Sequence, residues 1–102
     1  MTGRALPDFV AEIELLPTVA GGRKSALLGG EWRTVLGLNG EHWSALLRFG
    51  GEPAPGAVFD ANVWLLRADL ALPLFEVGET FEVWEGGTKA WGRVKQMTGH
   101  AE

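Results

Sequence analysis

The sequence predicts a small all-β protein with six antiparallel strands, arranged as a barrel or a sandwich. Apolar and polar residues alternate in several short runs, which is the period of strands with one buried face. Clusters of glycine and proline separate these runs at short intervals. Two of the separators, Asn39-Gly40 and Gly86-Gly87, are dipeptides typical of hairpin loops. Many short strands with such turns favour a barrel or sandwich architecture.

The chain of 102 residues is long enough for one compact domain and too short for two. We expect residues 1–7 to form a flexible N-terminal arm, residues 8–97 to form a single β domain, and residues 98–102 to form a C-terminal tail. No apolar run is long enough for a transmembrane helix or a signal peptide, and cysteine is absent. We therefore expect a cytoplasmic protein without disulfides and without membrane association.

The first predicted strand covers residues 8–16 and ends at Pro17. Its apolar residues alternate with Glu12 and Glu14, so one face of the strand is expected to be wet. The following residues, up to position 30, contain a Gly-Gly turn and no periodic pattern. We predict an irregular loop there.

A hairpin is predicted next, from residues 32–38 and 42–49. Its loop is Asn39-Gly40, because both central residues of a type I′ turn adopt positive φ and this dipeptide tolerates that conformation. Four apolar residues of the return strand share one side, namely Trp43, Ala45, Leu47 and Phe49.

The longest strand is predicted over residues 58–67, after a loop rich in glycine and proline. Alternation places Phe59, Ala61, Val63 and Leu65 on its inner side and Asp60, Asn62 and Trp64 on its outer side. Residues 67–78 are ambiguous. Their first half can form one helical turn, but Pro73 and Gly78 prevent a long helix.

The closing hairpin, residues 80–97, consists of two alternating runs around Gly86-Gly87. A two-residue loop there brings residues of the same face opposite one another, in the pairs Phe81–Gly92, Glu82–Trp91, Val83–Ala90 and Trp84–Lys89. Trp84 and Trp91 then become diagonal neighbours on the outer face, and Lys89 can lay its stem on the Trp84 ring.

Six apolar residues from three of the predicted strands are expected to point into one interior, namely Phe9, Ile13, Phe59, Val63, Phe81 and Val83. Each lies at an apolar position of an alternating run, so each shares a face with the other apolar residues of its strand.

Several short motifs follow one another along the chain: Phe9-x-Ala11-Glu12, Gly21-Gly22-Arg23, Gly30 with Trp32-Arg33, Pro55-Gly56, Phe81, Glu85-Gly86-Gly87 and Val94. In this order they resemble the third, C-terminal β-barrel domain of translation elongation factor Tu and its relatives. The resemblance spans residues 7–97. It implies that residues 8–97 form a six-stranded antiparallel β-barrel.

The sequence also departs from this family. Ser25-Ala26 stand where the family commonly has Thr-Pro, Thr34-Val35 replace Pro-Gln, Thr88 replaces the arginine after Glu-Gly-Gly, and Trp91 and Arg93 replace glycines. In full-length factors this domain helps to hold aminoacyl-tRNA through the T-stem and contacts the GTPase domain. This chain contains no GTPase domain, so the resemblance implies the fold more strongly than the function.

The sequence offers little for catalysis or for a cofactor. Residues 18–25, TVAGGRKS, lack the glycine spacing of a P-loop and the helix that follows it, so we expect no nucleotide binding. Two histidines, His42 and His100, without cysteine make a poor metal set. Ser44 and His42 are neighbours on one strand, which is not the geometry of a catalytic triad. We expect no enzyme, metal or cofactor.

Outward carboxylates are expected to keep the strands soluble rather than to act as an acid–base pair; they are Glu12, Glu14, Glu82 and Glu85. The net charge of −4, from nine basic and thirteen acidic residues, argues against a general nucleic-acid binder.

Outward tryptophans are the main functional signal, because large exposed aromatic side chains are enriched in protein interfaces. We predict a protein-binding surface made of Trp64, Trp84, Trp91 and Glu82, in a non-catalytic binding module that the resemblance links to translation. One alternative is that loops of the same chain cover these rings. Another is self-association through the same face.

RNA binding is a further alternative, because basic residues interleaved with an aromatic ring can hold a phosphate backbone and stack a base. The residues concerned are Arg23, Lys24, Lys89, Trp91, Arg93 and Lys95, which would bind a tRNA-like stem. The simpler interpretation is a solvated strand face whose lysines discourage edge pairing.

Overall fold

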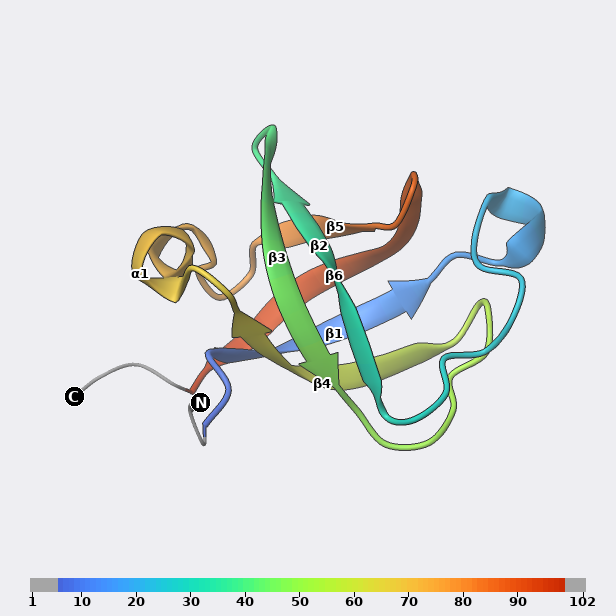
Figure 1. Ribbon diagram of the computed structural model, residues 1–102. Helices are drawn as coiled ribbons and strands as arrows, with labels where there is room; N and C mark the ends of the chain where they lie inside the picture. The colour runs from blue at the N-terminus through green and yellow to red at the C-terminus, as the bar shows by residue number, and fades with distance from the viewer. Residues whose placement is uncertain (1–5, 99–102) are drawn as a thin grey trace.

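In the computed structural model, which describes residues 6–98, these residues form a closed antiparallel barrel of six strands (Figure 1). The strands are β1 (Phe9–Leu15), β2 (Glu31–Leu38), β3 (Glu41–Arg48), β4 (Val58–Leu65), β5 (Thr80–Trp84) and β6 (Thr88–Met97). Around the barrel their order is β1-β4-β3-β2-β5-β6, and β6 pairs back onto β1. The predicted all-β class and the six-stranded barrel are confirmed.

Each predicted strand is present, and the largest boundary error is at the end of β4. That strand was predicted to reach residue 67 and to be the longest. It ends at Leu65 and has eight residues, whereas β6 has ten. The flexible arm predicted over residues 1–7 and the tail predicted over 98–102, with His100, lie mostly outside the described residues. Of these segments the structure describes Leu6, Pro7 and Thr98, and the Thr98 hydroxyl donates to the Pro7 carbonyl at 3.0 Å.

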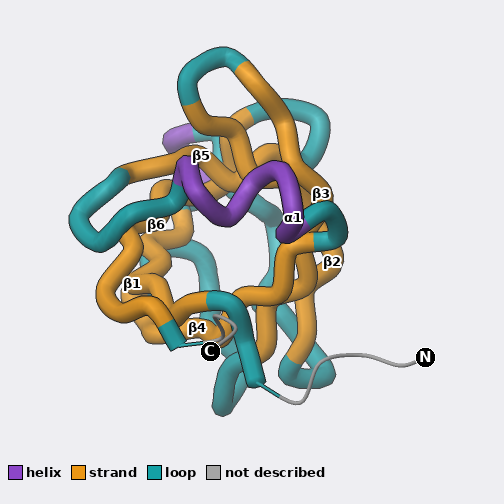
Figure 2. Tube along the Cα trace, turned by 90° about the vertical axis from the view of Figure 1, so that its left-hand side faces the viewer, coloured by secondary structure: helices purple, strands orange, loops and turns teal. Residues whose placement is uncertain are grey.

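The ambiguous segment after β4 forms a short α1 (Ala68–Ala71) and a 3-10 turn η2 (Leu72–Leu74). Figure 2 shows α1 lying across one opening of the barrel. Ala71 and Phe75 of this segment are fully buried, and the Phe75 ring stacks on Phe9 with 5.2 Å between centroids. The segment therefore closes this end of the core. At its start, hydrogen bonds from the Arg67 guanidinium lower the pKa of Asp69.

The core contains five of the six residues predicted to point inward, and these five are at most 1% exposed: Phe9, Ile13, Val63, Phe81 and Val83. The sixth, Phe59, is only partly buried. Its ring packs against Phe49 with 5.1 Å between centroids, close to the point where β3 and β4 separate. Phe59 is therefore a rim residue of the core.

The Asn39-Gly40 loop joins β2 to β3 as predicted. Leu38 pairs with Glu41, and φ is 54° at Asn39 and 81° at Gly40. Both residues thus lie in the left-handed region that a type I′ turn requires.

Gly40→Val is expected to lower the free energy of unfolding by about 1–3 kcal/mol, because a β-branched side chain resists positive φ. Urea denaturation followed by tryptophan fluorescence measures this change. Gly50→Val is the matched control, since a Cβ at Gly50 meets nothing within 4 Å and its φ is not positive. Equal unfolding midpoints for the two variants would contradict the turn assignment.

The loop between β5 and β6 differs from the prediction. Val83 pairs with Ala90 as expected, but Trp84 pairs with Thr88 instead of Lys89. The loop therefore has three residues, Glu85 to Gly87, and the Glu85 N–H donates to the Gly87 carbonyl at 2.8 Å. Gly87 adopts φ 136°, outside the type I′ range, and Lys89 becomes the extra residue of a β-bulge.

Candidate protein-binding surface

The predicted surface residues come from three strands, and only two of these strands are adjacent. Trp84 on β5 and Trp91 on β6 lie on neighbouring strands, with Glu82 on β5 directly opposite Trp91. Trp64 lies on β4, which is opposite β5 in the strand order of the barrel. Because outward side chains on opposite walls of a barrel point in opposite directions, Trp64 does not extend this surface. We name Trp84, Trp91 and Glu82 the aromatic platform.

No loop within residues 6–98 buries the two platform tryptophans. Trp84 is 42% exposed and Trp91 is 50% exposed, so the alternative that these rings are packed inside the monomer is wrong. For Trp64 that alternative holds in part. Its ring is half-buried, and the Arg48 guanidinium lies over it at 5.6 Å from the centroid.

Trp84 contacts β2 and, on β3, His42. It pairs with Val35 of β2, and the Thr34 hydroxyl donates to the Trp84 carbonyl at 3.1 Å. The Trp84 ring contacts His42, with 5.7 Å between ring centroids. His42 is exposed beside the Asn-Gly loop, and its imidazole contacts this indole.

The predicted contacts of Trp84 with Lys89 and with Trp91 are not formed. In the bulge, Lys89 is displaced from the position opposite Trp84, and its ammonium donates to the Gly21 carbonyl at 3.1 Å. Within residues 6–98 no aromatic ring contacts the Trp91 ring. The register shift changes the partner of Trp84, while the pair Glu82–Trp91 keeps its predicted register.

Trp91 lies between two carboxylates. It pairs with Glu82 on β5 and with Glu14 on β1, and directly opposite residues in a sheet have Cβ atoms about 4.5–5.5 Å apart. The proximity of Glu14 was not foreseen. It depends on the pairing of the first strand with the last, which no local pattern in the sequence indicates.

The Glu82 side chain is fixed in place over β2. A Cβ at Gly37 would lie 2.8 Å from both Cγ and Oε2 of Glu82, so the bare glycine backbone provides the space for this carboxylate. The Thr88 hydroxyl donates to Glu82 Oε1. The carboxylate therefore has a defined position at the edge of the platform.

The basic residues predicted to bind RNA are mostly paired with acceptors of the same chain. Arg93 lies 4.0 Å from Glu12, Lys95 lies 3.0 Å from Asp60, and Arg23 lies 2.8 Å from Glu85. Lys24 is exposed and has no acceptor within the described part of the chain. Since carboxylates balance most of these charges, the face around Trp91 carries little excess positive charge.

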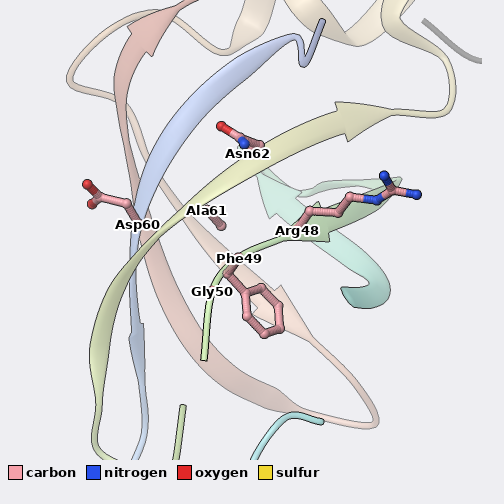
Figure 3. Close-up of a pocket in the computed structure, with 6 residues that line it drawn as sticks. All are labelled: Arg48, Phe49, Gly50, Asp60, Ala61 and Asn62. Carbon is pink, nitrogen blue, oxygen red and sulfur yellow. The ribbon is translucent and has the colours of Figure 1, made fainter. Parts of the chain in front are cut away.

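A cavity of about 360 Å³ opens where β3 and β4 separate (Figure 3). The ladder between these strands ends at the pair Arg48–Asn62. Six residues line the cavity, namely Arg48, Phe49, Gly50, Asp60, Ala61 and Asn62. Its one carboxylate, Asp60, is paired with Lys95 outside it. No sequence pattern had indicated this cavity.

Among residues 6–98, no group of three or more His, Cys, Asp or Glu side chains is placed to hold a metal ion. The same part of the chain contains no helix that is both long enough and apolar enough to cross a bilayer.

The fold and the surface together define a small closed antiparallel β-barrel that carries an exposed pair of tryptophans on two adjacent strands. No model of a known protein family matches the sequence, and a search of curated proteins finds no match either.

Proposed function

We propose that this protein is a non-catalytic binding module that binds a protein partner through the aromatic platform on β5 and β6. The observation that carries the proposal is the exposure of Trp84 and Trp91, two large side chains on adjacent strands of a rigid sheet. Tryptophan is enriched among the residues that dominate binding energy at interfaces. A closed barrel has no free sheet edges at β5 and β6, so a partner would bind side chains on this wall rather than extend the sheet.

The arrangement of the platform supports binding more than chemistry. Glu82, its carboxylate, is fixed by Thr88 and lies over Gly37, on the open outer wall of the barrel. General acid–base groups act in sites that exclude water and perturb their pKa values, and an open strand face provides neither condition.

The resemblance to the third domain of elongation factor Tu suggests the pathway. We propose that the partner belongs to the translation machinery and that the protein acts in the cytoplasm. The six-stranded barrel is the architecture that this resemblance implies, which supports the proposal at the level of fold alone.

The double variant Trp84→Ala, Trp91→Ala is expected to remain folded and to lose partner binding by at least about 30-fold, because truncating a hot-spot residue costs about 2 kcal/mol or more. Immobilised protein is incubated with a lysate of the source organism, with and without RNase. The proteins retained by wild type and variant are then quantified by mass spectrometry. Trp64→Ala, which removes a tryptophan from the other wall, is the matched control and is expected to retain the partner.

The alternatives give different results in the same experiment. Loss of all retained proteins after RNase would assign the surface to RNA. If the wild type forms a dimer in sedimentation velocity and the double variant does not, the surface would be assigned to self-association. Retention of the same partners by the double variant and wild type would contradict the proposed surface.

A further inference from the structure

At two tryptophans of this barrel, an arginine of the same chain lies over the ring and is also paired with a glutamate. Arg23 lies over the Trp32 ring at 5.7 Å and its guanidinium is 2.8 Å from Glu85. Arg48 lies over the Trp64 ring at 5.6 Å and its guanidinium is 3.1 Å from Glu31. In both cases a guanidinium lies over an indole and is paired with a carboxylate, an arrangement that suits the planar, delocalised cation of arginine.

Trp91 also has carboxylates beside it, but it is more exposed and has no arginine. Glu82 and Glu14 lie on either side of it in the sheet, and half of its surface is exposed. No cation of the described residues lies over its ring. The nearest cations along β6 are Lys89 and Arg93. Lys89 donates to the Gly21 carbonyl, and Arg93 is paired with Glu12.

Neither flanking carboxylate has an ion-pair partner among residues 6–98. Glu14 is exposed and has no ion-pair partner within residues 6–98. Glu82 accepts one hydrogen bond, from the neutral hydroxyl of Thr88, which orients it without neutralising its charge. An indole face between two carboxylates, in a protein of net charge −4, attracts a cation by its ring quadrupole and by Coulomb forces.

We propose that the protein partner inserts an arginine side chain over Trp91, where its guanidinium binds Glu14 and Glu82. This inference rests on the proposed function and specifies its partner as a protein segment that presents arginine. Lysine fits less well, because its ammonium is a compact point charge that neither stacks on an indole nor binds a carboxylate in a planar fork.

The test uses a short probe peptide, acetyl-Gly-Arg-Gly-Arg-Gly-amide, titrated into the ¹⁵N-labelled protein and followed by NMR. The lysine analogue has the same charge, and the citrulline analogue has the same shape without charge. We expect a saturable shift of the Trp91 indole N–H with the arginine peptide, an apparent affinity about fivefold lower with the lysine peptide, and no saturation with the citrulline peptide. A Trp91→Ala variant is expected to lose the binding.

Charge is tested separately from the indole. Glu14→Gln with Glu82→Gln is expected to weaken binding of the arginine peptide by about tenfold, as loss of two moderately exposed charge pairs implies. Glu52→Gln with Glu76→Gln changes the net charge equally at two exposed residues outside the platform, and this control is expected to bind as wild type does. The titration is repeated at higher salt, where the affinity is expected to fall.

Equal binding of the arginine and citrulline peptides would overturn the inference, and so would equal losses in the two glutamine double variants. If the peptide fails to bind while the Trp84→Ala, Trp91→Ala variant still loses its partner, the arginine inference is wrong and the proposed function stands. A second copy of the chain is a different occupant that also presents arginine, because Arg33 is exposed and has no ion pair among the described residues. A wild-type dimer that Arg33→Gln abolishes would likewise overturn the inference of a separate partner.

Discussion

Phe81→Ala is expected to lower the free energy of unfolding by about 3–5 kcal/mol, the usual cost of deleting a fully buried phenylalanine ring. Phe81 is 1% exposed, and its ring contacts Phe9 and Phe75 edge to face, at 6.2 and 5.6 Å between centroids. Phe75 belongs to the segment that closes one end of the barrel, so the cavity would lie where β1, β5 and this closing segment meet. A loss of this size is a large part of the stability of a small domain.

Equilibrium unfolding in urea measures the loss, and Phe59→Ala is the matched control. The alternating pattern predicted that both residues point into the interior. Phe59 is only partly buried, so the Phe59→Ala variant is now expected to lose clearly less stability than the Phe81→Ala variant. Equal losses for the two variants would show that the ring of Phe81 is not packed as described.

Gly92→Ala is expected to cost about 2–3 kcal/mol, although alanine is normally the better residue in a strand. A Cβ at Gly92 would lie 2.4 Å from Cε1 and Cζ of Phe81 and 3.0 Å from Cδ1 of Ile13. These atoms are buried among other rings and cannot move away cheaply. The glycine therefore provides the space that the Phe81 ring occupies, as the predicted pairing of these two residues required.

A double-mutant cycle tests this explanation. Phe81→Leu removes the ring atoms that the new methyl group would meet, so adding Gly92→Ala to Phe81→Leu is expected to cost at least about 1 kcal/mol less than adding it to wild type. Gly50→Ala is the control, because a Cβ there meets nothing within 4 Å. Additive losses in the cycle would mean that strain in the strand itself, and not contact with Phe81, explains the cost of Gly92→Ala.

Two features of the aromatic platform could be read from the sequence. Alternation placed Trp84 and Trp91 on the outer face, and both are exposed there. Cross-strand pairing from the hairpin placed Glu82 opposite Trp91, and this pair is present. Both inferences use only the two-residue period of a strand and a short loop, which are local properties of the chain.

The details of the platform could not be predicted. The β-bulge at Lys89 changed the partner of Trp84, because a Gly-Gly sequence permits several loop conformations and the one adopted has three residues. Trp64 has the same outward pattern as the other two tryptophans. Its separation from them depends on the order of the strands around the barrel, which alternation does not encode.

The sequence by itself determined the six strands, the Asn39-Gly40 turn, most of the core and the outward orientation of the tryptophans, because each follows from residues close together in the chain. The tertiary structure decided which surfaces these elements form. Closing the barrel pairs β1 with β6 and β2 with β5, and so brings Glu14 beside Trp91 and Gly37 beneath Glu82. These contacts join residues far apart in the chain, whose pairing depends on how all six strands bury one common core.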